Sequence, residues 1–475
     1  MISDSEALDL AAPPSLALGG NRYKAILRLA LPTVFAMLSQ SIVNEIDVVY
    51  FSHLPVPESS RAQAALLPSL ILTWLFGGSL SAVSVGTQAL TARRYAEGHR
   101  LEAGAVLANA AFFTVVAGAV LSVVGIVTLP WFLHGIIDVP EVRTVALAYT
   151  RWRLYAVISM GASMAIKAFF DGIGKTHVHL VAALVMNAIN VLLCWMFIFG
   201  HLGAPRMGAP GAGLSAFLAT WIGLGIMCVY AFLVRGDYHP MRWENLSRKV
   251  TWAVLKLSVP AAAATVVMML GFSLFAKIVA RLDVIPGAGQ LGHNEAANSA
   301  ANTDIVETIK LTFTACLAFG TATATLISQS LGRKQPEEAQ KWGWASVRLG
   351  IVIFGVVGLC EGVLFTRPLV AFLSNSETVR AAALFPMRLM GVATPIIAVA
   401  MILSEGLFGA GNTKFVAVAQ FLLVFGCLVP GAYVLGILCH LSLNGIWMAA
   451  FAYACFAAVT MSAKFASGTW KHIKL

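Results

Sequence analysis

The chain has 475 residues, of which 59% are hydrophobic and only 11% are charged. An average soluble domain is about 25% charged, so this composition excludes a soluble protein, whose core could not bury so much apolar surface. The net charge of +10 could indicate nucleic-acid binding in a soluble protein, but in a membrane protein basic loops orient the spans. We therefore expect a lipid bilayer as the environment and no nucleic-acid partner.

The first segment, residues 1–21, is polar and acidic. We expect a flexible cytoplasmic tail, because no basic stretch precedes a short apolar core as in a cleaved signal peptide. Strands of a membrane β-barrel would be about 9–11 residues long and would alternate in polarity, unlike the long apolar runs that follow. These runs predict an all-α polytopic membrane protein with twelve transmembrane helices. They cover residues 26–51, 66–92, 103–133, 143–170, 178–200, 210–234, 251–281, 304–331, 344–373, 383–410, 414–439 and 443–466.

The first span contains the stretch SQSIVNEIDVVYF, residues 39–51, with two acids inside an apolar run. A helix turns about 100° per residue, so Gln40, Asn44 and Asp47 share one face, whereas Glu45 points about 160° away from Asp47. An acid at the centre of a span costs about 3 kcal/mol and faces a bundle interior or a water-filled cavity. Loss of water favours the neutral carboxyl group, so Asp47 could exchange a proton near neutral pH. A purely structural hydrogen bond to a neighbouring helix is the alternative.

Two further residues of the first span are candidates for the transport machinery. Pro32 removes a backbone hydrogen bond and permits a kink, so it is either a hinge or the start of the helix near the membrane surface. Met37 is a candidate lining residue for a substrate cleft, because methionine adapts to varied apolar ligands. Plain packing is the alternative for Met37.

The two halves of the chain resemble each other. LRLALP (27–32) corresponds to LKLSVP (255–260), GTQALTARR (86–94) to ISQSLGRKQ (327–335), and DGIGKT (171–176) to FGAGNT (408–413). The nearly constant separation predicts two homologous six-helix lobes around a central cleft, which is typical of transporters with parallel repeats. The lobes would be residues 22–234 and 251–475, joined by a cytoplasmic loop, residues 235–250. Most basic residues at the span ends lie on the side of the termini, which predicts that both termini are cytoplasmic.

These segments also resemble the multidrug and toxic compound extrusion (MATE) transporters. The similar pieces include SQSIVNEIDVVYFSHL, SVGTQALTARRYAEG, FFDGIGKTHVHLVAALVMNAIN and FGTATATLISQSLGRKQPEEAQKWGW. The resemblance implies a twelve-helix, two-lobed efflux antiporter that is driven by protons or sodium and exports mostly cationic, lipophilic compounds.

The resemblance also bears on individual residues of the first half. Asn44 and Asp47 match the family's first-span Asn-x-x-Asp, whose acid takes part in cation coupling, so Asp47 is the predicted proton carrier. In span five, Asn187 and Asn190 share a helix face and could hydrogen-bond Asp47 across the lobe. Many relatives carry a second acid four residues further on, where this chain has Cys194. That departure weakens any mechanism that needs two carboxylates in this lobe.

The second half offers fewer candidates. Glu307 and Lys310 in span eight are three residues apart and are predicted to pair, either structurally or in substrate binding and gating. For Glu361 and Arg388 we expect buried pairing or snorkelling at the span ends. Acids are scarce in spans seven and ten, and hard cations need oxygen ligands. Proton coupling is therefore favoured over sodium.

The sequence thus predicts a monomeric inner-membrane antiporter that exports small organic compounds by alternating access. It would use the proton motive force, with no cofactor and no metal site, and would not be an enzyme. The seven cysteines show no metal-ligand spacing. Three alternatives remain: a sodium-coupled multidrug antiporter, a flippase for lipids or lipid-linked oligosaccharides, and a polytopic membrane enzyme, for which no paired carboxylates or histidine-rich box argue.

Overall fold

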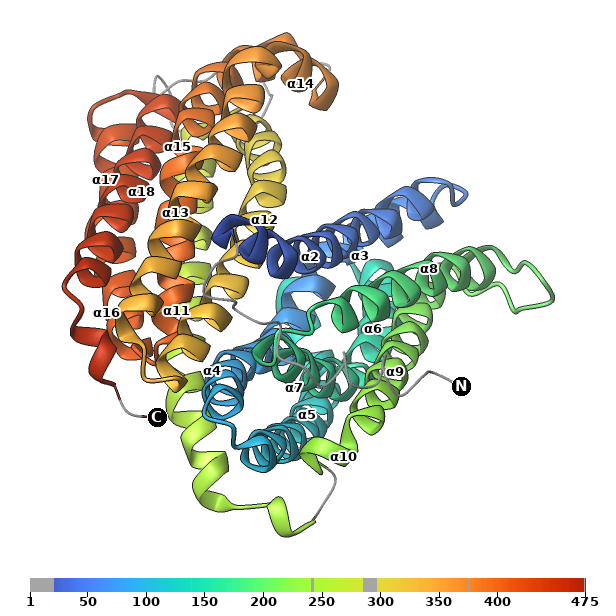
Figure 1. Cartoon of the computed structure of the whole chain (residues 1–475). Coiled ribbons are helices and arrows are strands. Elements are labelled where there is room, and N and C mark those ends of the chain that lie inside the picture. Colours follow the sequence, from blue (N-terminus) through green and yellow to red (C-terminus); the bar gives the residue numbers. More distant parts are fainter. Residues whose placement is uncertain (1–20, 138, 241–242, 285–296, 375, 474) are drawn as a thin grey trace. The chain divides into compact units, whose positions relative to one another are not determined.

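The structure is a computed structural model that describes the chain except for residues 1–20, 138, 241–242, 285–296, 375 and 474. The predicted tail, residues 1–21, therefore lies outside the described residues apart from Asn21. The described residues form helices joined by short turns, and they contain no β-strand (Figure 1). The predicted all-α fold class is confirmed.

Across the described residues, eleven helices are long and apolar enough to cross a membrane. A twelfth span forms if α3 (Glu58–Phe76) and the helical stretch Gly78–Ala96, which are bent by 42° at their junction, are taken together. Gly77 and Gly78 lie at this bend, where the chain turns from one helix into the next. Twelve spans is the number that the apolar runs predicted.

The described helices fall into two compact units. The first unit, residues 31–259, holds most of α2 and all elements up to the start of α11. These elements are α2 (Arg22–Ser52), α3, η1 (Gly78–Ala82), α4 (Val83–Ala96), α5 (Arg100–Ile136), α6 (Pro140–Tyr155), α7 (Val157–Gly172), α8 (His177–Phe199), α9 (Ala209–Leu233), α10 (Arg235–Tyr238) and η2 (Trp243–Asn245).

The second unit comprises the described residues of 21–30 and 260–475. Its elements are α11 (Arg248–Leu282), α12 (Ala297–Gly332), α13 (Pro336–Leu359), η3 (Cys360–Leu364), α14 (Thr366–Leu373), α15 (Glu377–Gly409), α16 (Thr413–Leu423), η4 (Val424–Leu428), α17 (Val429–Tyr433), η5 (Val434–Leu438), α18 (Ser442–Ala466) and η6 (Thr469–His472). Helix α15 is central here, because α12, α13 and α18 all pack against it.

The borders between the units lie inside helices. The first border follows Ala30 in α2, and the second follows Val259 in α11. Pro32 and Pro260, the last residues of the repeated LRLALP and LKLSVP motifs, stand within two residues of these borders. The beginning of α2 is attached to the second unit by an ion pair of 2.8 Å between Arg22 and Glu338.

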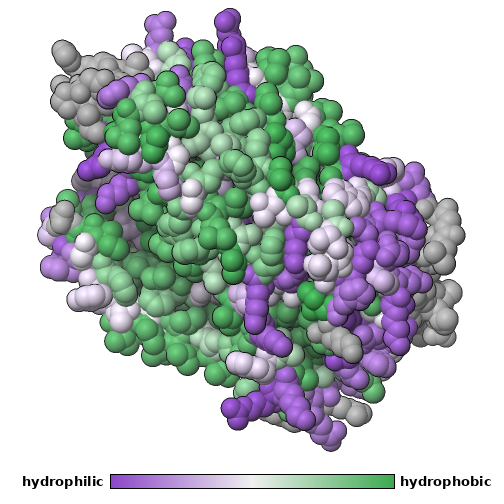
Figure 2. Space-filling model, turned by 90° about the vertical axis from the view of Figure 1, so that its left-hand side faces the viewer, coloured by the Kyte–Doolittle hydropathy of each residue, from purple (hydrophilic) through white to green (hydrophobic). Residues whose placement is uncertain are grey.

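The apolar surface fits a membrane layer. Exposed apolar side chains follow one another along α16, η4, α17 and η5, including Phe421, Leu422, Val434 and Leu438. Figure 2 shows a face of the molecule on which hydrophobic residues form a broad area and hydrophilic residues gather at its edges. Soluble monomers rarely expose broad contiguous apolar patches, so this surface suits a lipid environment.

One predicted span has different ends in the structure. The ninth apolar run, residues 344–373, was expected to be continuous, but the spanning helix runs from Pro336 to Leu364. The chain leaves the helix at Phe365 and begins a separate short helix, α14. Pro368 explains the division, because proline lacks an N–H group to continue the hydrogen-bonding ladder.

Helices α13 and α15 approach each other at glycines. A Cβ atom at Gly358 or Gly362 would collide with the backbone of Gly391. We expect Gly358→Ala to destabilise the protein by about 1–3 kcal/mol, the usual cost of overpacking a filled interior. The measurement is thermal unfolding of the purified protein, followed by tryptophan fluorescence.

Gly355 on the same helix provides the control, because a Cβ atom there would meet nothing within 4 Å. Gly355→Ala should leave the unfolding temperature unchanged or raise it, since alanine favours helices over glycine by about 1 kcal/mol. Equal unfolding temperatures for the two variants would contradict the close glycine packing.

Candidate functional site

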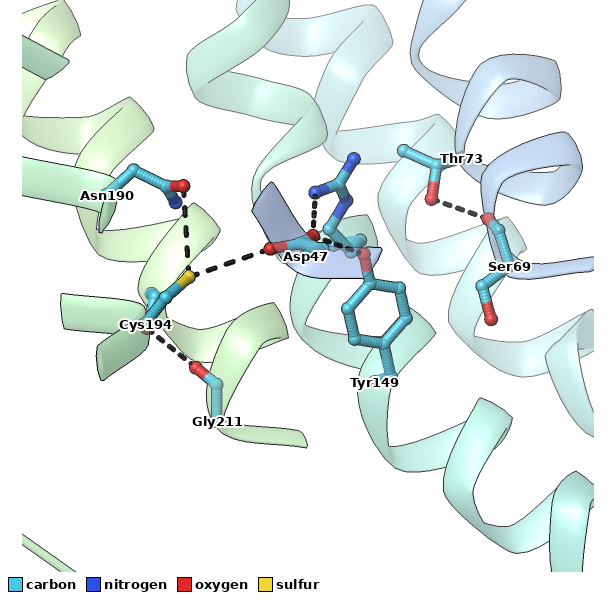
Figure 3. Close-up of polar contacts among 9 residues, drawn as sticks. Asp47, Ser69, Thr73, Tyr149, Asn190, Cys194 and Gly211 are labelled. Carbon is cyan, nitrogen blue, oxygen red and sulfur yellow. Dashed lines mark hydrogen bonds and ion pairs between the residues drawn. The ribbon is translucent and has the colours of Figure 1, made fainter. Parts of the chain in front are cut away.

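The carboxyl group of Asp47 lies inside the first unit, where α2, α6 and α8 meet (Figure 3). Asp47 is only 8% exposed, whereas Glu45, two residues earlier, is exposed. The predicted division of the two acids between different helix faces is therefore confirmed. An acid buried at this depth needs polar partners, and three neighbouring side chains supply them.

Helix α6 provides two of the partners. The Tyr149 hydroxyl donates a hydrogen bond of 3.1 Å to Oδ2 of Asp47. Nη1 of Arg153 lies 3.9 Å from the same oxygen, which is too long for a hydrogen bond but close enough for electrostatic attraction. Tyr149 and Arg153 are four residues apart and share a helix face, and the guanidinium lies over the tyrosine ring at 5.7 Å.

Helix α8 provides the third partner. The buried thiol of Cys194 lies 3.7 Å from Oδ1 of Asp47 and 3.8 Å from Oδ1 of Asn190. A thiol has one proton, so it can donate to only one of these two acceptors at a time. Asn190 is therefore connected to Asp47 through Cys194 rather than by a direct bond. The position that carries a second acid in many relatives holds a neutral donor here.

Asn187 does not reach Asp47. Its Nδ2 donates a hydrogen bond of 2.9 Å to Ser39, two helical turns before Asp47 on α2. The prediction that Asn187 bonds Asp47 is wrong. Helix α8 runs alongside α2, and Asn187 lies beside Ser39, whereas Cys194, two turns further along α8, lies beside Asp47. A second link between these helices joins the Tyr50 hydroxyl to the carbonyl oxygen of Val191 at 3.3 Å.

The other predicted residues of the first span lie on α2. Gln40 and Met37 are half-buried, as is Pro32. Asn44 belongs to the helix, but its side chain lies outside the part of the chain that the structure describes. The roles assigned to these four residues stay predictions.

Glu307 and Lys310 lie on α12 of the second unit and form the predicted pair, with Oε2 and Nζ 3.0 Å apart. Both side chains are exposed by 40% or more, and exposed pairs contribute about 0–1 kcal/mol. This pair therefore neutralises two charges on the helix surface without adding much stability.

Tyr149 and Arg153 were not predicted as site residues from the sequence. The overlooked signal was the segment YTRWR, residues 149–153, which places a hydroxyl and a guanidinium on one helix face in an apolar span. An arginine within a span usually has an acidic partner.

The part of the chain that the structure describes contains no group of three or more His, Cys, Asp or Glu side chains that could hold a metal ion. Around Asp47, the described direct contacts are a phenol, a thiol and a guanidinium. A positive guanidinium opposes a bound cation, and hard cations require several oxygen ligands.

The sequence profile of the MatE family matches residues 32–196 and 289–434, which together form well over half of the chain. The chain belongs to the MatE family. The two matched stretches fall in the two compact units, so the family signal covers both repeats.

Several curated members of the family are similar to this chain. A probable multidrug resistance protein NorM of Thermotoga maritima is 23% identical over 94% of this chain and 93% of that protein. The multidrug resistance protein MdtK of Cronobacter sakazakii is 24% identical over 87% and 88% of the two chains.

Solved structures agree with the fold. A MOP superfamily transporter from Pyrococcus furiosus superposes with a TM-score of 0.84 at 18% identity, over 94% of this chain and 96% of that one. An outward-facing multidrug resistance MATE transporter superposes with a TM-score of 0.83 at 18% identity, over 94% and 97%. This MatE protein therefore has the fold of a multi-pass membrane transporter.

Proposed function

We propose that this MatE protein exports small organic compounds, mainly lipophilic cations, by antiport with protons. The observation that carries the proposal is the position of Asp47, whose buried carboxyl group has a hydroxyl donor at 3.1 Å and a guanidinium at 3.9 Å. The curated relatives that match almost the whole chain are multidrug resistance proteins, which supports efflux of several compounds.

The surroundings of Asp47 suit two protonation states. When the carboxyl group is ionised, Tyr149 donates to it and Arg153 offsets its charge. When the carboxyl group of Asp47 is protonated, Tyr149 can still hydrogen-bond to it, but no negative charge then balances Arg153. No hydrogen bond joins the Arg153 guanidinium to the Asp47 carboxylate. A proton can therefore bind the carboxylate without first breaking such a bond.

The same arrangement links the proton to a cationic substrate. Ionised Asp47 attracts a cation, whereas protonation removes this attraction and exposes the substrate to the charge of Arg153. Substrate and proton therefore exclude each other, which antiport requires. Outside protons would release the substrate, the lobes would change access, and Asp47 would lose its proton to the cytoplasm.

Proton coupling is preferred over sodium coupling on electrostatic grounds. A sodium ion at Asp47 would lie close to the guanidinium of Arg153 and would find few oxygen ligands among the described neighbours. A proton needs only one oxygen. We assign the transporter to the cytoplasmic membrane as a monomer with both termini inside, because basic residues concentrate on that side.

The proposal is tested with the purified protein in liposomes, using the lipophilic cation ethidium as the probe. A pH gradient in sodium-free buffer should drive ethidium transport, whereas a sodium gradient with the pH gradient collapsed should not. Transport that follows the sodium gradient alone would refute proton coupling. Transport with neither gradient would refute antiport.

A further inference from the structure

A second acid lies within the membrane-spanning part of the second unit. Glu361 follows α13 and belongs to the π-helical turn η3, a widened turn that often occurs at functional sites. Val363, Leu364 and Phe365, the residues after this turn, are apolar and exposed. The surface at this level is therefore suited to hydrocarbon, and Glu361 itself is half-buried.

Among the described residues, the carboxyl group of Glu361 has one hydrogen-bond partner. The Thr312 hydroxyl on α12 donates a hydrogen bond of 2.9 Å to Oε1. The Thr366 hydroxyl donates at 2.9 Å to the backbone oxygen of Glu361, which holds the turn rather than the carboxyl group. The glycine contacts of Gly362 with α15 fix the same turn from the other side.

No basic residue pairs with Glu361 among the residues that the structure describes. The other charged side chains on α12, α13, α14 and α15 are Asp304, Glu307, Lys310, Glu337, Glu338, Lys341, Arg348, Arg367, Glu377, Arg380, Arg388 and Glu405. Glu307 pairs with Lys310, Glu338 with Lys341 and Glu337 with Lys471, and Arg380 donates to backbone oxygens. None of these lies within ion-pair distance of Glu361.

Each unit contains a carboxyl group in a membrane span that accepts a hydrogen bond from a hydroxyl on a neighbouring helix. The two acids occupy different helices of their units, so they are not copies preserved by the repeat. Asp47 has a guanidinium at 3.9 Å, whereas Glu361 has no described cation to offset its charge. Protonation would neutralise Glu361 without a basic partner.

We propose that Glu361 is a second proton-binding site of this transporter, loaded and emptied in each cycle together with Asp47. The Thr312 hydroxyl stabilises the ionised form and so lets the proton leave. Because the bond joins η3 to α12, gain and loss of the proton change the link between two helices of the same unit. The inference rests on the proposed proton antiport and extends it to two protons per cycle.

A proton suits this site better than a metal ion. The described oxygen atoms at the side chain are those of Glu361 itself and the Thr312 hydroxyl, and hard cations bind about six oxygens or more. One carboxyl group with one donor is sufficient for protonation.

Infrared difference spectroscopy of the full-length protein in liposomes tests the site without a substrate. A pH titration of the wild type should show two carboxyl C=O bands from buried acids. Glu361→Gln should lose one band and keep the other, and Asp47→Asn should show the reverse. Thr312→Val should retain the Glu361 band but shift its frequency, because the C=O group loses its donor.

Transport provides the second readout. With ethidium as the probe, Glu361→Gln should release about half as many protons per cation as the wild type, and it should retain the remainder through Asp47. Glu377→Gln, at the exposed start of α15, is the control and should behave as the wild type. Titrating bands in Glu361→Gln that match the wild type would overturn the proposal, as would an unchanged proton count. If Asp47→Asn alone behaved as the wild type, the fault would lie with the proposed function instead.

Discussion

Replacing Asp47 with asparagine should abolish the proton release that ethidium induces at this site. Asparagine has nearly the same shape and can still accept from Tyr149, but it cannot bind and lose a proton at physiological pH. Each proton that moves through 100 mV supplies about 2.3 kcal/mol, and each pH unit adds about 1.4 kcal/mol. One proton therefore supports roughly a hundredfold gradient or more of a neutral solute. Ethidium is itself a cation, so its one-for-one exchange with a proton moves no net charge and only the pH difference drives it, by about tenfold per pH unit. We expect the variant to lose that factor in ethidium accumulation.

The measurement uses everted membrane vesicles, in which released protons are detected with a pH-sensitive dye. The matched control is Glu45→Gln, because Glu45 lies two residues away on the same helix and is exposed. This control should release protons as the wild type does. Undiminished release in Asp47→Asn would remove Asp47 from the mechanism.

The second large effect is expected at Arg153. Arg153→Gln removes the only positive charge that is described near Asp47, so the buried carboxyl group has no cation to stabilise its ionised form. Substrate-induced proton release should then fall at neutral pH and recover in more alkaline buffer. Because a neighbouring arginine favours the ionised carboxyl group, we expect the pH profile of transport to move in the alkaline direction.

Arg151→Gln is the control for this experiment, because Arg151 lies on the same helix two residues away but is exposed. Its pH profile should match the wild type. Arg153→Lys should show an intermediate profile, since lysine keeps the charge but has a shorter, more strongly hydrated head group. Identical profiles for Arg153→Gln and the wild type would show that Arg153 serves packing alone.

Features that depend on a single helix could be predicted from the sequence. The separation of Asp47 from Glu45 and the pairing of Glu307 with Lys310 follow from helix periodicity, and both are present in the structure. The number of spans follows from the apolar runs. Each of these depends only on neighbouring positions in the chain, which a periodic pattern records.

Features that depend on which helices are neighbours could not be predicted in the same way. Tyr149 and Arg153 bind Asp47 across about one hundred residues of chain, and nothing in a single sequence states that α6 meets α2 at that level. The error at Asn187 has the same origin. Helix α8 was correctly expected beside α2. Which residue of α2 Asn187 contacts depends on how far one helix is shifted along the other, and a single sequence does not record that shift.

The positions of the unit borders affect how the molecule could be divided. The charged loop over residues 235–250 would seem the natural place to cut the gene into two halves. However, the opening turns of α11 pack with the first unit, and those of α2 pack with the second. If the two halves were expressed separately, each would contain the first turns of a helix that packs against residues of the other half. Folding of either fragment would then require its counterpart during membrane insertion.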